Sequence, residues 1–243
     1  MAAAFIKGAL ISFMPTFVGA VPNVTVFQIN PESITHQWRA AQGTTAPGQK
    51  GGDPLAVKGL PDETFSFTLF MDSNDEIADS DTNPVAGALA TGFGLYTRLA
   101  ALEMLQYPLP VSGDGLVGTV SASVSASGLN VSAAGAKAKD TSVPRLQVPV
   151  VLFVWGVQRI VPVRVTQISI TERLYDTALR PVHAEAQLSL QVLTPDDLVK
   201  VDEPMKTLGK IAYFYTQGLR QVQATLNLAD AAASILGMLP TPF

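Results

Sequence analysis

Four segments of the chain carry the hydrophobic patterns of β-strands. In residues 63–71 and 182–192, apolar and polar side chains alternate strictly, which predicts strands with one buried and one solvent-facing side. Residues 147–155 are almost continuously apolar, which is typical of a strand buried on both faces. In residues 159–173 the alternation changes phase between Val165 and Ile168, which predicts either a β-bulge or a strand that leaves one packing partner for another. We therefore expect residues 147–193 to form a three-stranded antiparallel meander.

Weaker patterns predict further strands towards the N-terminus. Residues 7–14 indicate a first strand followed by a Pro/Gly turn, and residues 23–30 are rich in β-formers. Residues 33–40 are expected to pair with residues 23–30. Residues 42–61 are rich in Gly and Pro, and we expect a loop there.

Two segments have helical periodicity. Residues 85–107 place leucines at spacings of three and four behind the start signal Asn83–Pro84, which predicts one amphipathic helix. Residues 205–239 predict a helical tail with a break near Gly218. Its apolar side chains form two faces that either pack on the same domain or dock on a neighbour. The candidate interface residues are Ile211, Phe214, Tyr215, Leu219 and Ile235.

These elements predict a mainly β protein with helices, of the α+β class. Residues 1–200 are expected to form the β domain, and residues 201–243 a C-terminal helical extension. Within the β domain, residues 112–143 consist mostly of Ser, Ala, Gly and Val without any aromatic residue. We interpret them as an insertion that forms either a flexible loop or a long β-excursion.

Composition narrows the class of protein. The chain has 243 residues, of which 47% are hydrophobic and 15% charged, so enough apolar surface exists to fold. It lacks cysteine, which excludes a disulfide scaffold and cysteine catalysis. The net charge of −4 gives no basic excess for binding nucleic acid. A mean hydropathy of +0.27 indicates apolar surface that is covered by a partner or by other copies of the chain.

The apolar N-terminus resembles a secretory signal only loosely, because Lys7 lies inside the apolar run and Ser12 and Pro15 interrupt it. We interpret it as the first strand. The sequence lacks an uncharged apolar run of the roughly 18 residues that a membrane-spanning helix needs, so no membrane insertion is expected.

The sequence offers little catalytic chemistry. His36 and His183 are not embedded in a known motif, and the nucleophile-elbow, phosphate-loop and dinucleotide fingerprints are absent. The acidic residues between Asp72 and Asp81 lack the pattern of a calcium loop, and we interpret them as a solvated loop. Glu172 and Glu185 leave paired-carboxylate hydrolysis as an alternative. We predict no enzyme activity, no cofactor and no metal site.

Seven segments, in order, carry a resemblance to a known family: residues 7–10, 22–35, 60–65, 99–105, 149–156, 168–172 and 183–194. Together they resemble the tube-domain family of contractile injection systems, the phage-tail-like particles of bacteria. Its baseplate members, which start the inner tube and often carry a C-terminal LysM module, are the most similar. The resemblance covers about residues 7–110 and 147–220.

The resemblance implies a structural protein with a tube-like antiparallel β-sandwich or barrel and a flanking helix. Members form a ring, usually a hexamer, between the central hub or spike and the first ring of the inner tube. The implied partners are other copies of the chain, the tube protein, the hub or spike, and baseplate proteins. Assembly is expected in the cytoplasm, within a phage-tail-like particle.

The chain departs from this family in two places. No LysM module follows the tube domain, and the insertion at residues 112–143 is not part of the pattern. Two alternative functions therefore stay open: a repeating subunit of the inner tube, and a secreted β-barrel that binds an apolar ligand.

Overall fold

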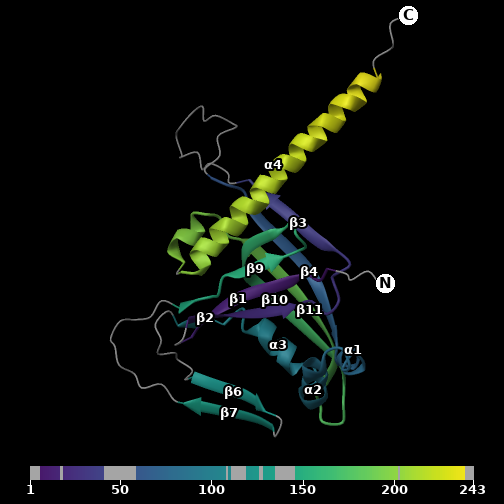
Figure 1. Ribbon diagram of the computed structural model, residues 1–243, viewed down its shortest axis with the longest axis vertical. Helices are drawn as coiled ribbons and strands as arrows, with labels where there is room; N and C mark the ends of the chain where they lie inside the picture. Colours follow the sequence, from purple (N-terminus) through teal and green to yellow (C-terminus); the bar gives the residue numbers. More distant parts are fainter. Residues whose placement is uncertain are drawn as a thin grey trace, which may run out of the picture.

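A seven-stranded antiparallel sheet forms the body of the protein (Figure 1). The computed structural model describes residues 6–16, 19–40, 59–107, 109–110, 119–125, 128–134, 146–201 and 203–238. The strand order in the sheet is β2-β1-β9-β10-β11-β4-β3. Its strands are β1 (Ala9–Thr16), β2 (Gly19–Val26), β3 (Ile34–Arg39), β4 (Asp62–Asp72), β9 (Val151–Val154), β10 (Ile160–Tyr175) and β11 (Pro181–Val192).

Helices and two small two-stranded sheets complete the described chain. The helices are α1 (Ser73–Ala78), α2 (Pro84–Phe93), α3 (Tyr96–Glu103), the 3₁₀ turn η1 (Asp197–Lys200) and α4 (Met205–Met238). The small sheets pair β5 (Leu109–Pro110) with β8 (Leu146–Gln147), and β6 (Thr119–Ser125) with β7 (Gly128–Ala134). The predicted mixture of antiparallel β-structure and helices is thus confirmed. The sheet is open, with β2 and β3 as its two edges.

The strand predictions hold best where alternation is strict. β9, β10 and β11 form the predicted antiparallel meander, and the register of β10 against β11 shifts between Val165 and Gln167, where the bulge was expected. The partner predicted for residues 33–40 is wrong. β3 pairs with β4, because β2 is already paired with β1 in a hairpin-like arrangement.

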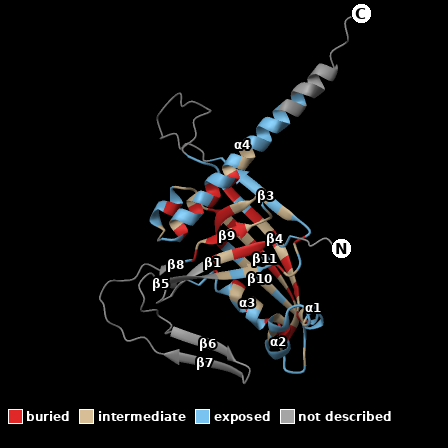
Figure 2. Ribbon diagram, viewed as in Figure 1, coloured by how far each residue is buried: buried red, intermediate tan, exposed pale blue. Residues whose placement is uncertain are grey.

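One face of the sheet carries the hydrophobic core. The inward side chains of β4 and β11 meet those of β9 and β10, and the leucines of residues 95–105 cover them. Figure 2 shows these buried residues concentrated in the sheet and the segments packed on it. The largest fully buried side chains are Phe27, Phe65, Phe153, Leu10, Leu95, Leu99, Leu102, Leu105, Leu188, Leu190, Leu198 and Val151.

The opposite face of the sheet is polar and open. Its cross-strand rows consist mainly of serine, threonine and glutamine, because the alternating positions of β3, β4 and β11 point away from the core. One row runs Thr35–Ser66–Ser189, and the next runs Gln37–Thr64–Gln191 and continues to Arg164 of β10.

The single helix predicted for residues 85–107 is wrong. α2 ends at Phe93, α3 begins at Tyr96, and the two axes differ in direction by 93°. Gly94 makes the bend with a left-handed φ of 60°, which favours glycine. A Cβ atom there would lie 2.9 Å from the carbonyl oxygen of Pro181, so the β10–β11 turn also needs this glycine.

The break predicted near Gly218 is also wrong, since α4 is continuous from Met205 to Met238. A helical glycine costs only about 1 kcal/mol relative to alanine. Thr216 and Arg220, which lie on either side of Gly218, both contact the sheet. These contacts keep the helix continuous through the glycine.

Some predictions fall outside the described residues, including most of the loop at residues 42–61 and much of the insertion at residues 112–143. Of the insertion, the pairing of β6 with β7 is described. The division into residues 1–200 and 201–243 stays a prediction.

Candidate assembly surfaces

The first half of α4 is fixed to the sheet by its inner face. Met205, Ala212, Tyr213 and Thr216 are buried there. The Thr216 hydroxyl accepts a hydrogen bond from the N–H of Ile160 at 3.1 Å and donates one to the Ile160 carbonyl at 2.7 Å. This hydroxyl thereby satisfies both the N–H and the carbonyl of Ile160, the first residue of β10. The two hydrogen bonds fix the position of the helix along the sheet.

The outer face of the same helix contains the predicted interface residues. Ile211 and Phe214 are each 61% exposed, and Tyr215 is 46% exposed although its hydroxyl donates to the Val157 carbonyl at 2.9 Å. Leu219 is half-buried. Ile235 lies in α4, but its side chain is outside the described residues. The helix therefore presents large apolar side chains to solvent, and their role as an interface stays a prediction.

The second half of α4 stands away from the body. Figure 1 shows the helix extending past the sheet to the end of the molecule opposite α1 and α2, and Figure 2 shows it becoming exposed as it leaves the sheet. Gln223, which donates to Gln158 at 3.0 Å, is the last residue of α4 with a side-chain hydrogen bond to the body among the described residues. Val222, Leu226 and Leu228 are all more than half exposed.

A buried carboxylate connects α4 to the edge of the sheet. Glu63 is only 5% exposed; Arg220 donates to its Oε2 at 2.9 Å and also bonds its Oε1. His36 Nε2, on the edge strand β3, lies 2.6 Å from Glu63 Oε1. Three elements, β3, β4 and α4, therefore meet at one carboxyl group.

The electrostatics of this cluster follow from burial and pairing. Burial alone raises the pKa of Glu63, but Arg220 and His36 outweigh it and hold that pKa below its ordinary value. Burial lowers the pKa of His36, and Glu63 counteracts this only in part. Arg159 lies over the ring of Phe65 at 5.3 Å, and its pKa is lowered by burial and by Arg220.

Sequence reasoning missed this cluster, although one signal was present. Glu63 falls in the same alternation phase as Phe65 and Phe67, so the pattern of β4 already places its carboxylate on the core side. A carboxylate on a core face needs a partner. Its partner Arg220 lies 157 residues away, and no sequence pattern points to it.

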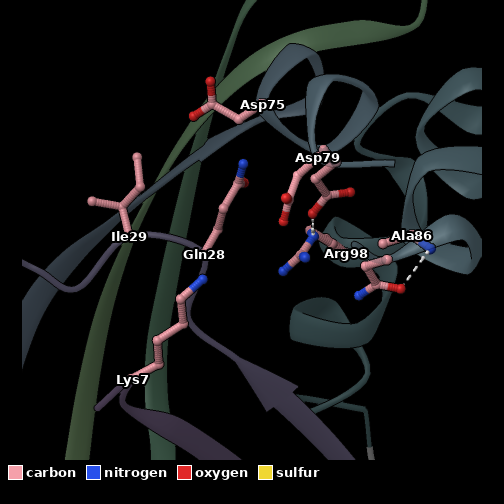
Figure 3. Close-up of a pocket in the computed structure, with 9 residues that line it drawn as sticks. Lys7, Gln28, Ile29, Asp75, Asp79, Ala86 and Arg98 are labelled. Carbon is pink, nitrogen blue, oxygen red and sulfur yellow. Dashed lines mark hydrogen bonds and ion pairs between the residues drawn. The ribbon is translucent and has the colours of Figure 1, made fainter. Parts of the chain in front are cut away.

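A polar pocket of about 290 Å³ lies at the opposite end of the molecule, between α1, α2, α3 and the segments next to β1 and β2 (Figure 3). Arg98 points into it from α3 and pairs with Glu76. Burial raises the pKa of Glu76, and Arg98 offsets only part of that effect. Asp75, Asp79 and Lys7 also line the pocket. Arg98 thereby joins the helices to the sheet, since it pairs with Glu76 of α1 and also donates to the Val26 carbonyl of β2 at 3.3 Å.

The two candidate carboxylates of a hydrolase do not meet. Glu172 is opposite Ala184 in the register and Glu185 is opposite Thr171, so their side chains project from opposite faces of the β10–β11 hairpin. Glu185 pairs with Arg173 at 3.2 Å, and Glu172 accepts a hydrogen bond from the Tyr175 hydroxyl at 3.3 Å. The paired-carboxylate arrangement is therefore wrong.

The remaining titratable residues show no metal-binding arrangement in the described ranges, where no group of three or more His, Asp or Glu side chains gathers. The acidic segment expected to be a loop contains the short helix α1, whose N-cap is Asp72. In the same ranges, no single helix is long and apolar enough to cross a membrane; α2 and α3 reach that threshold only when taken together across their bend.

Comparisons with known proteins leave the family of the chain open, because no protein-family model matches it and no curated protein matches it significantly.

Proposed function

We propose that the chain is a structural subunit of a contractile injection system. In this proposal, copies form a ring at the baseplate that joins the hub or spike to the inner tube and starts assembly of the tube. The proposal begins from the seven segments that resemble the tube-domain family.

The observation that carries the proposal is the open sheet, whose two edges β2 and β3 have no further strand paired with them among the described residues. An edge strand offers unpaired backbone N–H and C=O groups, and native proteins cover or pair such edges. Pairing β3 of one copy with β2 of the next copy would satisfy both edges at once. Repeated around an axis, this head-to-tail contact closes into a ring. The tube-like sandwich or barrel would then be completed by neighbouring copies.

The open polar face of the sheet supports the same arrangement. Thr, Ser and Gln side chains fill the middle of this face on β3, β4 and β11, and charged residues of both signs, Arg39, Asp62, Asp72 and Glu185, lie towards its ends. Such a face suits the wall of a water-filled channel, since it is hydrated and lacks a strong field of either sign. We assign this face to the lumen of the ring.

The positions of the resembling segments are consistent with the proposal. They supply β9, most of β11, the start of β4 and the second part of α3, together with buried residues such as Leu10, Phe27 and Phe153. The described part of the insertion, in contrast, contributes the separate β6–β7 pair and no strand of the main sheet.

Sedimentation of native lysate, with quantitative mass spectrometry of the pellet, tests this function. We expect the chain to pellet with sheath and tube proteins at a few copies per particle. Abundance equal to that of the tube protein would instead identify a repeating tube subunit. A chain that stays soluble in cells that assemble particles would overturn the proposal and favour the ligand-binding barrel.

Charge on the edge strand tests the ring contact itself. The double variant Thr35→Lys/Gln37→Lys places lysines on β3, where like residues block edge pairing in native proteins. Gln187→Lys places the same charge on the same face, but in the central strand β11. We expect native mass spectrometry to find monomers for the edge variant and rings for the control. Rings in both would contradict pairing through β3.

A further inference from the structure

The end of β10 and the turn that leads to β11 hold two leucines in a strained conformation. Leu174 and Leu179 have φ values of 54° and 59°, in the left-handed region that disfavours branched side chains. Their residues are 72% and 74% exposed, so neither side chain contributes to the core. Glycine or asparagine would satisfy this backbone better. Leucine at these two positions therefore lowers the stability of the fold relative to glycine or asparagine.

Hydrogen bonds make the turn rigid. Asp176 Oδ1 accepts from the N–H groups of Ala178 and Arg180 at 2.8 and 2.9 Å, and its Oδ2 accepts from Arg180 Nε at 2.6 Å. Arg180 Nη1 then donates to the carbonyls of Thr91 and Gly92, at the end of α2, at 2.9 and 2.5 Å. The two leucines are thus presented in fixed positions, which reduces the entropy lost on binding.

Further apolar side chains extend this surface. The Tyr96 hydroxyl donates to the Leu179 carbonyl at 3.3 Å, which places the start of α3 beside the turn. Phe93, Tyr96 and Tyr175 are 38%, 46% and 52% exposed. We call these five residues the turn patch: Phe93, Tyr96, Leu174, Tyr175 and Leu179.

The surroundings of the turn patch are acidic. Its nearby arginines are neutralised, because Arg98 pairs with Glu76, Arg173 with Glu185 and Arg180 with Asp176. The adjoining α1–α2 segment adds the exposed Asp75, Asp79 and Asp81, none of which has an ion pair within the described residues.

The acidic segment is held close to the turn, since the Ser73 hydroxyl at the start of α1 donates to the Val182 carbonyl at 3.3 Å. Lys7, which shares the pocket with Asp75 and Asp79, is the cation that opposes them. The carboxylates still outnumber it.

We infer that the turn patch docks another protein subunit, whose contact segment combines apolar side chains with lysine or arginine. The acidic flank selects this basic partner by charge complementarity. It also disfavours a symmetric contact between two copies of the chain, because like-charged flanks would face each other. The inference rests on the proposed function, in which the patch faces a neighbouring layer at the end of the molecule opposite the free half of α4 (Figure 1).

The variant Leu174→Asn/Leu179→Asn tests the inference without threatening the fold, because asparagine accepts a left-handed backbone. We expect its melting temperature to equal or exceed that of the natural sequence, and its incorporation into sedimenting particles to fall at least tenfold. Thr177→Asn, in the same turn, is the matched control and should be incorporated normally. A lower melting temperature, or normal incorporation of the double variant, would overturn the inference.

Two further measurements separate this inference from the proposed function. Rings of the purified Leu174→Asn/Leu179→Asn variant should form as in the natural protein, so loss of the ring contradicts a role confined to docking. The second measurement places a photo-crosslinking residue at position 179. In cells, it should crosslink to a different protein, at a segment that contains lysine or arginine. Crosslinks only to copies of this chain, or none, would refute the inference even where rings form. If the natural chain never sediments, the proposed function fails, while the crosslink still decides the docking partner.

Discussion

Gln28 joins the end of β4 through both atoms of its side-chain amide: Nε2 donates to the Asp72 carbonyl at 2.6 Å, and Oε1 accepts from the Asp72 N–H at 3.0 Å. Gln28 follows β2, at one edge of the sheet, whereas β4 is next to the other edge. The amide imitates one rung of a β-ladder and holds the two sides of the curled sheet together at this end.

Removal of the amide donor should therefore loosen the sheet. Gln28→Glu keeps the shape but replaces the donor by a second acceptor facing the Asp72 carbonyl. We expect a loss of about 1–3 kcal/mol in the free energy of unfolding, the usual cost of an unsatisfied polar group. Urea denaturation measures it. Gln187→Glu, on the exposed face of β11, is the control and should change stability by less than about 0.5 kcal/mol.

The close packing around Gly8 predicts that a larger side chain at this position destabilises the protein. A Cβ atom at this position would lie 2.7 Å from the Phe27 ring and 2.8 Å from the Trp155 ring. Both rings are part of the packed interior, so Gly8→Ala should cost about 1–3 kcal/mol through overpacking. Gly59→Ala, where a Cβ atom meets nothing within 4 Å, should have little effect in the same denaturation experiment.

The contact of Arg220 with Glu63 predicts coupling between α4 and the sheet. Arg220→Gln leaves a carboxylate that is buried and only partly paired, and we expect a loss of about 1–3 kcal/mol, reduced because the arginine is partly exposed. A double-mutant cycle with Glu63→Gln should give a coupling energy above about 0.5 kcal/mol. Additive effects of the two substitutions would argue that the pair does not hold the helix.

The same cluster predicts acid sensitivity. His36 has a lowered pKa, so the unfolded chain takes up a proton near its ordinary value of 6.5 while the folded chain does not, and stability falls as the pH drops below that value. Glu63 acts in the same direction at lower pH, because its pKa is also lowered in the folded state. Thermal melts between pH 4 and 8 should show a smaller decline just below pH 6.5 for His36→Gln than for the natural sequence. Equal declines would contradict the prediction.

If the outer face of α4 is an interface, charged substitutions on it should leave folding intact and prevent assembly. Ile211→Glu/Phe214→Glu changes two side chains that are mostly exposed, so the melting temperature should stay within a few degrees of the natural value. Incorporation into particles should be lost if this face docks on a neighbour. Gln221→Glu, also exposed on α4, is the control. Normal incorporation of the double variant would exclude this face from the interface.

Local patterns predicted the sheet more successfully than the contacts between distant segments. The alternation in β4 and β11 and the phase change in β10 were sufficient to place three strands and a bulge. The bend at Gly94 was missed because its cause, the carbonyl of Pro181, is 87 residues away in sequence. The pairing of β3 with β4 was missed for a similar reason, since adjacency in sequence favoured β2.

Local sequence patterns were also insufficient to identify the candidate surfaces. The apolar periodicity of α4 identified Ile211 and Phe214, but it could not tell which apolar residues pack inward. The turn patch was missed altogether, because a left-handed leucine leaves no periodic signal in the sequence. Only the backbone of the folded chain reveals its strain.

The geometry of α4 makes it a lever arm. About 15 residues extend past Gln223 to the end of the helix, which corresponds to about 22 Å at the rise of an α-helix. A tilt of about 10° at Gln223, just past the contacts of Thr216 and Arg220, would move the far end by about 4 Å, roughly the rise of two to three helical residues. Small adjustments where the helix meets the sheet are thereby amplified into displacements large enough to engage or release whatever the tip contacts.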